Sequence, residues 1–228
     1  YARNYMEIQA EQMLRLGTLA DYEHPYFTMD PEYEGAVLEV FASLVGEGLV
    51  YRDLKPVHWS IENRTALADA ELEYYDREDS SVFVMFEVSG TLPESLAAPV
   101  GEPCHLMIWT TTPWTLPANE AVALNGELDY VLVHGNLNGR ALSLVLAAEL
   151  AGMVAARLGL DDVRELGTAS GAALEHQRLK HPFYDKTVPV ILGDHVTVEA
   201  GTGAVHTAPG HGEEDFDVGK DYDLPVTS

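Results

Sequence analysis

The side chains best suited to chemistry lie in two short segments, and the first spans residues 109–119. Eleven residues carry five hydroxyl or amide side chains, namely Thr110, Thr111, Thr112, Thr115 and Asn119, braced by Trp109, Trp114 and two prolines. Threonine hydroxyls both donate and accept hydrogen bonds, so they can hold a water molecule or a carbonyl oxygen. β-Branched residues also favour an ordinary strand. The density of polar groups nevertheless predicts a rigid polar pocket.

The second segment spans residues 201–216 and combines glycines with titratable groups. Its glycines allow close approach of the backbone, and it contains His206, His211 and Asp215. We predict that both segments line one site. One alternative is a metal-dependent hydrolase, because His206, His211 and Asp215 have the spacing His-x4-His-x3-Asp. That spacing is a weak signal, and we expect no metal.

Composition limits the classes of function. The chain has 228 residues, 46% of them hydrophobic, which suffices for one substantial core. We find neither an apolar run long enough to span a membrane nor a signal peptide, and the single cysteine, Cys104, agrees with a reducing compartment. The sequence therefore predicts a cytoplasmic protein without membrane contact.

The formal net charge of −24 restricts the partners of the chain. A nucleic-acid partner ordinarily requires a basic face that neutralises phosphates and releases counterions. With only 13 lysines and arginines, the chain is expected to bind nucleic acid weakly by itself. The composition therefore disfavours a second alternative, a noncatalytic nucleic-acid-binding module.

The pattern of apolar residues changes along the chain. Apolar positions at helical spacing predict two helices near the N-terminus, the first ending at Gly17 and the second beginning at Asp30–Pro31 and ending by Gly46–Gly48. A further helix is expected at residues 148–158, ended by Gly159. We expect strands at residues 71–74, 82–88, 106–111, 120–124, 129–134, 141–145, 188–192 and 196–199.

These elements predict a mainly β fold with α insertions. Residues 1–60 form a helical part, and residues 61–228 form a strand-rich part that closes into a six-stranded β-barrel.

Both polar segments resemble the editing domain of isoleucyl-tRNA synthetases, an insertion within class I aminoacyl-tRNA synthetases. The string His-Thr-Ala-Pro-Gly-His-Gly at residues 206–212 is similar to the bacterial form. Thr112 and Trp114 flank the proline where leucyl and valyl relatives usually carry an acidic residue and an arginine. Residues 54–60, 64–74, 181–184 and 189–197 also match family segments, in family order. A departure lies at residues 60–63, where some bacterial relatives have two cysteines.

The resemblance implies roles for individual residues. Thr111, Thr112 and Asp215 would be catalytic, with Asp215 pairing with the ammonium group of the substrate. His206 would form the wall of a side-chain pocket that admits valine and excludes isoleucine. The substrate-binding set would be Trp109, Thr110, Trp114, Thr115, Asn119, His206 and Asp215.

The resemblance also implies partners. The domain would hydrolyse valine from the 3′ end of mischarged isoleucine tRNA, with valyl-adenylate as a second candidate substrate. Residues 1–60 would connect to the remainder of the synthetase. The chain lacks both the His-Ile-Gly-His-like and the Lys-Met-Ser-Lys-Ser-like signatures that bind ATP. We therefore expect a fragment that does not charge tRNA alone and needs no cofactor, whereas the full enzyme would use ATP and Mg²⁺.

Overall fold

The computed structural model describes residues 1–99 and 101–227. The chain divides into two compact units, Tyr1–Asp53 and Leu54–Ser228. The boundary lies ahead of the predicted division after residue 60. Within the described residues, no helix combines the length and apolar character needed to cross a membrane.

The first unit contains the two predicted helices, α1 (Ala2–Arg15) and α2 (Pro31–Gly46). Asp30 occupies the N-cap position of α2, and Pro31 begins the helix, where its missing N–H costs no hydrogen bond. Gly17 and Gly48 follow the helices with positive φ angles of 77° and 72°. Both predictions are confirmed. Neither helix has a buried residue within the described chain.

The second unit contains two sheets. A small antiparallel pair joins β1 (Trp59–Ser60) to β2 (Thr65–Ala66). The large sheet has the strand order β11-β5-β10-β9-β3-β4-β7-β6-β8. Its strands are β3 (Val82–Val88), β4 (Cys104–Thr110), β5 (Ala121–Leu124), β6 (Asp129–Leu137), β7 (Arg140–Ala147), β8 (Asp161–Ser170), β9 (Arg178–Lys180), β10 (Thr187–Leu192) and β11 (Ala204–Thr207).

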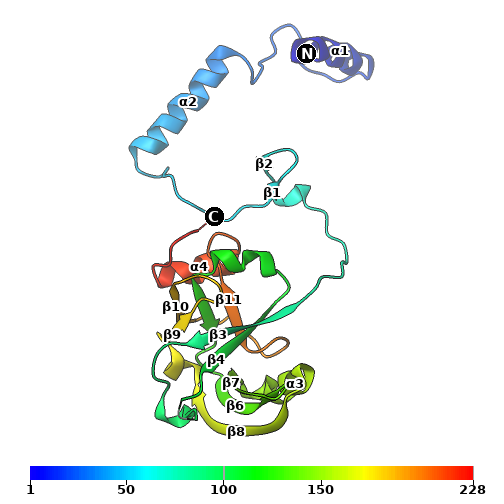
Figure 1. Cartoon of the computed structure of the whole chain (residues 1–228). Coiled ribbons are helices and arrows are strands. Elements are labelled where there is room, and N and C mark those ends of the chain that lie inside the picture. The colour runs from blue at the N-terminus through cyan, green and yellow to red at the C-terminus, as the bar shows by residue number, and fades with distance from the viewer. Residues whose placement is uncertain (100, 228) are drawn as a thin grey trace. The chain divides into compact units, whose positions relative to one another are not determined.

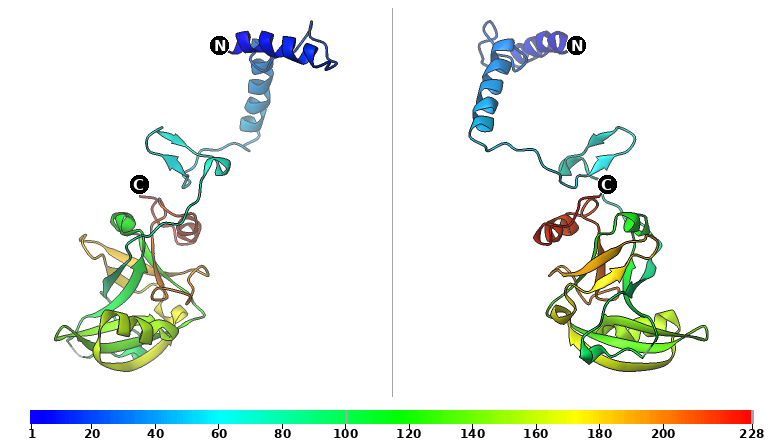
Figure 2. Two further views of the ribbon diagram at one scale, coloured as in Figure 1. Left: turned by 90° about the vertical axis from the view of Figure 1, so that its right-hand side faces the viewer. Right: turned by 60° about the vertical axis from the view of Figure 1, so that its left-hand side comes forward.

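The large sheet is mixed and has two ends. The β4–β7 and β5–β10 pairs are parallel, and the other neighbours are antiparallel. In Figure 1, β6, β7, β8 and the helix α3 (Ala148–Leu158) gather at one end of this unit, while β10, β11 and α4 (Glu213–Asp221) lie at the other. The views in Figure 2 show the same separation. The core between them includes the fully buried Phe86, Ile108, Leu132 and Leu144.

The prediction of a closed six-stranded barrel is wrong. Nine strands form one sheet, and closure would require its two outermost strands, β8 and β11, to pair with each other. Among the described strands, β11 pairs only with β5, and β8 pairs only with β6. Most residues of β8 are exposed. The sheet therefore retains two edges.

Several element predictions are confirmed, and others are wrong. Strands β3, β4, β5, β6, β7 and β10 and helix α3 lie where the apolar pattern placed them, and Gly159 ends α3 in the left-handed conformation. Residues 71–74 form no strand. Their alternating apolar and acidic side chains do not correspond to a buried face, because Tyr74 is 86% exposed. Residues 196–199 form no strand: the Val196 amide donates to Gly193 O and closes a turn, and a bend follows at residues 198–199. The sequence analysis missed the strands β1, β2, β8, β9 and β11 and the helix α4.

The remaining local structure consists of short 3₁₀ turns. These are η1 (Asp69–Glu71), η2 (Glu94–Leu96), η3 (Pro113–Ala118) and η4 (Gly171–Leu174). The single cysteine, Cys104, begins β4 and is 6% exposed. Burial raises the pKa of its thiol to about 12, so Cys104 is an unreactive core residue.

A glycine turn directs the chain into β11. Gly203 has a φ of 74°, and a Cβ at this position would lie 2.2 Å from Ala147 Cβ. The Tyr130 hydroxyl donates to Gly203 O at 2.6 Å. Burial raises the pKa of Tyr130 to about 12, which keeps that donor protonated. Gly203 therefore meets both a backbone and a packing requirement.

We predict that Gly203→Ala lowers the free energy of unfolding by about 2 kcal/mol or more, because it adds left-handed strain to a steric clash. Gly139→Ala is the matched control, since Gly139 has a φ of 78° with no atom within 4 Å of the added Cβ. The control should lose only about 1 kcal/mol. Urea unfolding of both variants measures the difference. Equal losses would show that Ala147 moves aside at little cost.

Candidate active site

The threonine segment is a turn between two strands. Trp109 and Thr110 end β4, and the six-residue 3₁₀ turn η3 follows. Pro113 begins η3 and Pro117 lies within it, so the backbone cannot continue as a strand. Asn119 is the C-cap residue that follows η3, and the fully buried strand β5 begins at Ala121. The prolines thus turn the hydroxyl groups out of the sheet.

Pairing of β5 with β11 brings the two polar segments together. The strands are antiparallel, with Thr207 opposite Ala121 and His206 opposite Val122. The Glu120 amide donates to Thr207 O at 2.9 Å and extends this pairing toward η3. His206 consequently reaches back to η3, whose residues lie about ninety positions earlier in the chain.

Hydrogen bonds fix both the orientation and the tautomer of His206. The Thr115 hydroxyl donates its hydrogen to Thr112 O at 2.8 Å, so its 2.9 Å contact with His206 Nε2 must use a proton from the imidazole. Asn119 Nδ2 donates to Ala121 O at 2.7 Å and also lies 3.4 Å from His206 Nδ1, which then accepts. His206 is therefore the Nε2–H tautomer.

His206 is also neutral at pH 7. Its side chain is 7% exposed, and burial lowers its pKa below the ordinary value, while the negative charge of Asp215 opposes that shift. Because both ring nitrogens already have protein partners, His206 has no free lone pair to accept a proton from water. It is placed as a wall of the site rather than as a general base.

Asp215 lies in the first turn of α4, three residues after the N-cap residue Gly212. One carboxylate oxygen, Oδ2, accepts a hydrogen bond from the Ala208 amide at 2.9 Å. The other oxygen, Oδ1, has no hydrogen-bond partner among the described residues. A helix N-terminus stabilises a negative charge. Asp215 is therefore a fixed carboxylate with one oxygen available to a ligand.

These residues line a pocket of ≈ 440 Å³. Its lining includes five of the predicted site residues, Thr112, Trp114, Thr115, His206 and Asp215, together with Val205, His211 and Gly212. Val205 and Gly212 were not predicted, although they adjoin His206 and His211 in the sequence. The structure thus joins the two polar segments at one concave site.

Four predicted residues do not line this pocket. Thr110 is buried behind it, where its hydroxyl accepts from the Thr112 amide at 3.0 Å and contacts the Thr112 hydroxyl at 3.1 Å. Asn119 is fully buried and holds His206. Trp109 packs against Gly201. Thr111 is exposed on the surface of the turn.

Two further residues, His181 and Lys186, hold η3 from outside the pocket. His181 is 5% exposed, and its Nε2 lies 3.1 Å from Leu116 O. Its Nδ1 accepts from the Tyr184 amide at 3.2 Å, so Nε2 carries the proton and donates. Lys186 Nζ donates to Asn119 O at 2.6 Å. Residues 181–184 matched a family segment, but nothing in the sequence connected them with η3.

The geometry does not favour the metal-ligand alternative. In the part of the chain that the structure describes, no group of three or more His, Cys, Asp or Glu side chains is placed to hold a metal ion. Both nitrogens of His206 and one oxygen of Asp215 already have protein partners. His206, His211 and Asp215 therefore line a pocket without forming a ligand set.

Fold, pocket and sequence together define the class of protein. Residues 1–204 match the family of class I tRNA synthetases for isoleucine, leucine, methionine and valine. The chain belongs to this family. The crystal structure of GlLeuRS-CP1 has a TM-score of 0.51 at 16% identity, covering 62% of this chain and 63% of that one, so the fold is shared.

Among individual relatives, the chain is similar to isoleucine–tRNA ligases. It is 48% identical to that of Aeromonas salmonicida over 236 residues, a match that covers 100% of this chain and 24% of the relative. The enzyme of Methylococcus capsulatus is also 48% identical, with 99% and 24% covered. The chain spans about a quarter of the length of these relatives.

Burial of neutral histidines predicts a pH-dependent stability. Burial lowers the pKa of His105, His181 and His206 in the folded chain below the value of 6.5. The unfolded chain therefore binds more protons once the pH falls below that value, and the free energy of unfolding should decrease between pH 7.5 and 5.5. Above pH 7.5 this contribution is constant.

His206→Gln should decrease that slope, measured by urea unfolding at several pH values. The variant His176→Gln is the control for removing a histidine from the surface, since the His176 side chain is 72% exposed. A His206→Gln slope equal to that of the unmodified chain would contradict a buried neutral imidazole at this position.

Proposed function

We propose that the pocket hydrolyses the ester bond of valyl-tRNA(Ile), as the post-transfer editing site of an isoleucine–tRNA ligase. One observation carries this proposal: an anchored carboxylate, threonine hydroxyls and a neutral histidine wall meet in a pocket of ≈ 440 Å³. That volume suits a small acyl group attached to a sugar. The similarity to isoleucine–tRNA ligases supports the choice of amino acid.

Asp215 anchors the substrate by its ammonium group. The Ala208 amide holds Oδ2, which leaves Oδ1 to accept a charge-assisted hydrogen bond. This contact selects an aminoacyl ester over an acyl group without an amine. It also orients the ester carbonyl toward η3, and positioning of this kind lowers the barrier of a reaction whose ester is already reactive.

Thr112 is the hydroxyl best placed to act on the reacting atoms. It lines the pocket, and its contact with Thr110 Oγ1 restricts its rotation. The hydroxyl can hold the attacking water or donate to the carbonyl oxygen as negative charge develops. A catalytic role for Thr111 remains a prediction. The scheme requires no metal, cofactor or covalent intermediate.

His206 supplies the second stage of amino-acid selection. Thr115 and Asn119 hold its ring from opposite nitrogens, so the wall cannot rotate away from a larger side chain. A single methylene gives too little binding energy for accurate discrimination in one step, and isoleucine against valine is the standard illustration of that limit. A rigid wall that excludes isoleucine would remove the error at a second site.

The proposed reaction implies which molecules bind the chain. The substrate is the single-stranded 3′ end of mischarged tRNA, with valyl-adenylate as a second candidate, and the remainder of the synthetase would hold the body of the tRNA in the cytoplasm. A noncatalytic tRNA-binding module is less favoured, because a chain of net charge −24 offers little attraction to phosphates.

The first test measures release of valine from valyl-tRNA(Ile) by the chain, with isoleucyl-tRNA(Ile) as the comparison substrate at low salt. Asp215→Asn keeps an acceptor for the Ala208 amide but removes the charge, and kcat/KM should fall by about 10- to 100-fold. Asp215→Ala should lower kcat/KM further, since it also leaves the Ala208 amide without its acceptor. If Asp215→Asn kept full activity, the ammonium anchor would be wrong.

The second test separates selection from catalysis at His206. His206→Ala opens the wall, so hydrolysis of isoleucyl-tRNA(Ile) should appear while hydrolysis of the valyl ester persists. Rates on both esters are measured for each variant. A reduced rate on valine without any gain on isoleucine would instead assign His206 a direct part in the reaction.

A further inference from the structure

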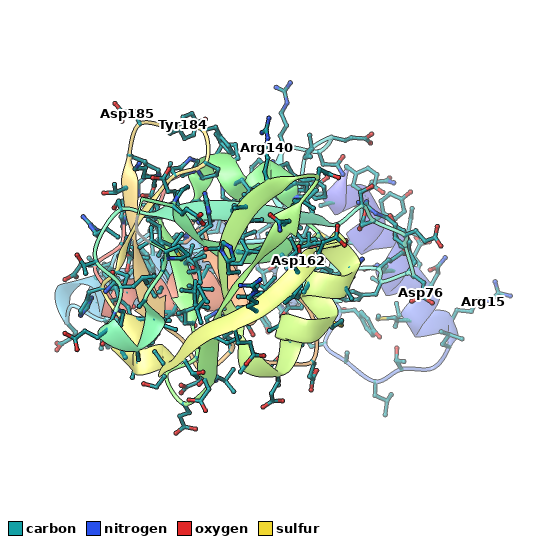
Figure 3. All side chains as sticks on the ribbon, turned by 60° about the horizontal axis from the view of Figure 1, so that its bottom comes forward. Arg15, Asp76, Arg140, Asp162, Tyr184 and Asp185 are labelled. Carbon is teal, nitrogen blue, oxygen red and sulfur yellow. The ribbon has the colours of Figure 1, made fainter. Side chains whose placement is uncertain are left out.

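In the part of the chain that forms the large sheet, the exposed aromatic side chains lie on η3 or on a turn attached to it. Between residues 82 and 227 of the described chain, only three aromatic residues are strongly exposed: Trp114 at 63%, Phe183 at 54% and Tyr184 at 50%. Trp114 lines the pocket. Phe183 and Tyr184 lie in the turn between β9 and β10, and Figure 3 shows Tyr184 beside Asp185 where this turn projects from the strands.

The turn is internally rigid. The His181 amide donates to Lys186 O at 2.9 Å, and the Lys186 amide donates to Tyr184 O at 2.8 Å. The Tyr184 ring stacks on the His181 ring with centroids 4.9 Å apart and an interplanar angle of 28°. The Phe183 ring meets His181 edge-on at 4.6 Å. Both aromatic rings are therefore held at the surface without being buried.

The same turn is fixed to the pocket. His181 donates to Leu116 O, the carbonyl directly after Thr115, and Lys186 donates to Asn119 O. Two hydrogen bonds thus attach the turn to the C-terminal half of η3 and to its C-cap residue, while Trp114 and Thr115 from η3 line the pocket. The aromatic pair consequently has a defined position beside the site where the ester would react.

Charge decides which part of a nucleic acid this surface can contact. Asp185 is exposed at the tip of the turn, and Lys186 Nζ is engaged by Asn119 O and, at 3.1 Å, by Glu120 Oε1. The surface therefore repels phosphate rather than attracting it. An uncharged contact does not depend on counterion release, and unpaired bases stack on exposed aromatic rings whatever their sequence.

We propose that Phe183 and Tyr184 form a stacking surface for an unpaired base of the tRNA 3′ end whose ester occupies the pocket. This inference rests on the proposed function and names the contact that holds the acceptor strand. The ring pair acts through substrate affinity, and the hydrogen bonds of His181 and Lys186 set its distance from Thr112 and Thr115.

The test uses the chain with Phe183→Leu and Tyr184→Leu combined, and measures KM and kcat on valyl-tRNA(Ile). KM should rise about fivefold or more, with kcat nearly unchanged, because loss of base stacking weakens binding without altering the reacting groups. Tyr184→Phe keeps the ring and should keep KM. Tyr75→Leu is the matched surface control, since Tyr75 is also exposed but lies outside this turn.

The outcomes distinguish this inference from the proposed function. An unchanged KM in the double variant would overturn the stacking surface. So would a decrease in kcat at constant KM, which would mean that the rings only support η3 through His181. If the unmodified chain released no valine, the proposed function would fail. In that case the stacking surface is tested separately, by the affinity of each variant for a single-stranded oligonucleotide ending in CCA. Only a stacking surface predicts weaker binding by the double variant.

Discussion

The site depends on the pairing of β5 with β11. This pairing is short, but its register places Thr207 opposite Ala121 and so carries His206 to the end of η3. Two segments that are far apart in the sequence thereby share one pocket. A shift of one residue would turn His206 to the opposite face of the sheet. The glycine turn at Gly203, fixed by Tyr130, sets where β11 begins and thus protects that register.

A buried polar wall has to satisfy its hydrogen bonds within the protein. Asn119, His206 and Thr115 form a chain in which each donor has a defined acceptor, ending at Thr112 O. Both imidazole nitrogens are engaged in hydrogen bonds, so His206 is not free to act as a general acid or base, and its ring is held in one orientation. Polar atoms of the pocket lining that remain available to a substrate then include the Thr112 hydroxyl and one oxygen of Asp215. The same two hydrogen bonds therefore fix the ring of His206 and leave it without a free nitrogen.

The sequence predicted those parts of the structure in which local pattern and burial agree. Strand β3 and helix α3 have continuous apolar signals, and Gly159 marks the end of α3. Strand β8 was missed because it is an exposed edge with charged residues and no apolar alternation. Strand β11 lies within the glycine-rich and histidine-rich segment, which has the composition of a loop. Missing these edge strands led directly to the incorrect closed barrel.

The candidate site was predictable to a similar extent. The sequence identified both polar segments, but not which of their residues line the pocket. Thr112 and His206 line it, whereas Thr110 and Asn119 are buried and hold those two residues by hydrogen bonds. The roles of His181 and Lys186 could not be predicted, since they arise from contacts to backbone carbonyls, which carry no side-chain signal. Residue types can indicate a pocket, whereas the supports of that pocket require the tertiary structure.

Electrostatics explain why such supports matter for an acidic chain. With a net charge of −24, long-range attraction cannot bring a polyanion to the pocket, so affinity has to come from short-range contacts with exact placement. A carboxylate at the site also repels phosphate, which favours ligands that present an ammonium group there. The pocket is thus suited to a ligand whose cationic end enters it and whose anionic backbone is held elsewhere. The hydrogen bonds that fix η3 keep the few groups that can attract the ligand at constant spacing. Affinity then comes from these placed contacts and not from long-range electrostatic attraction.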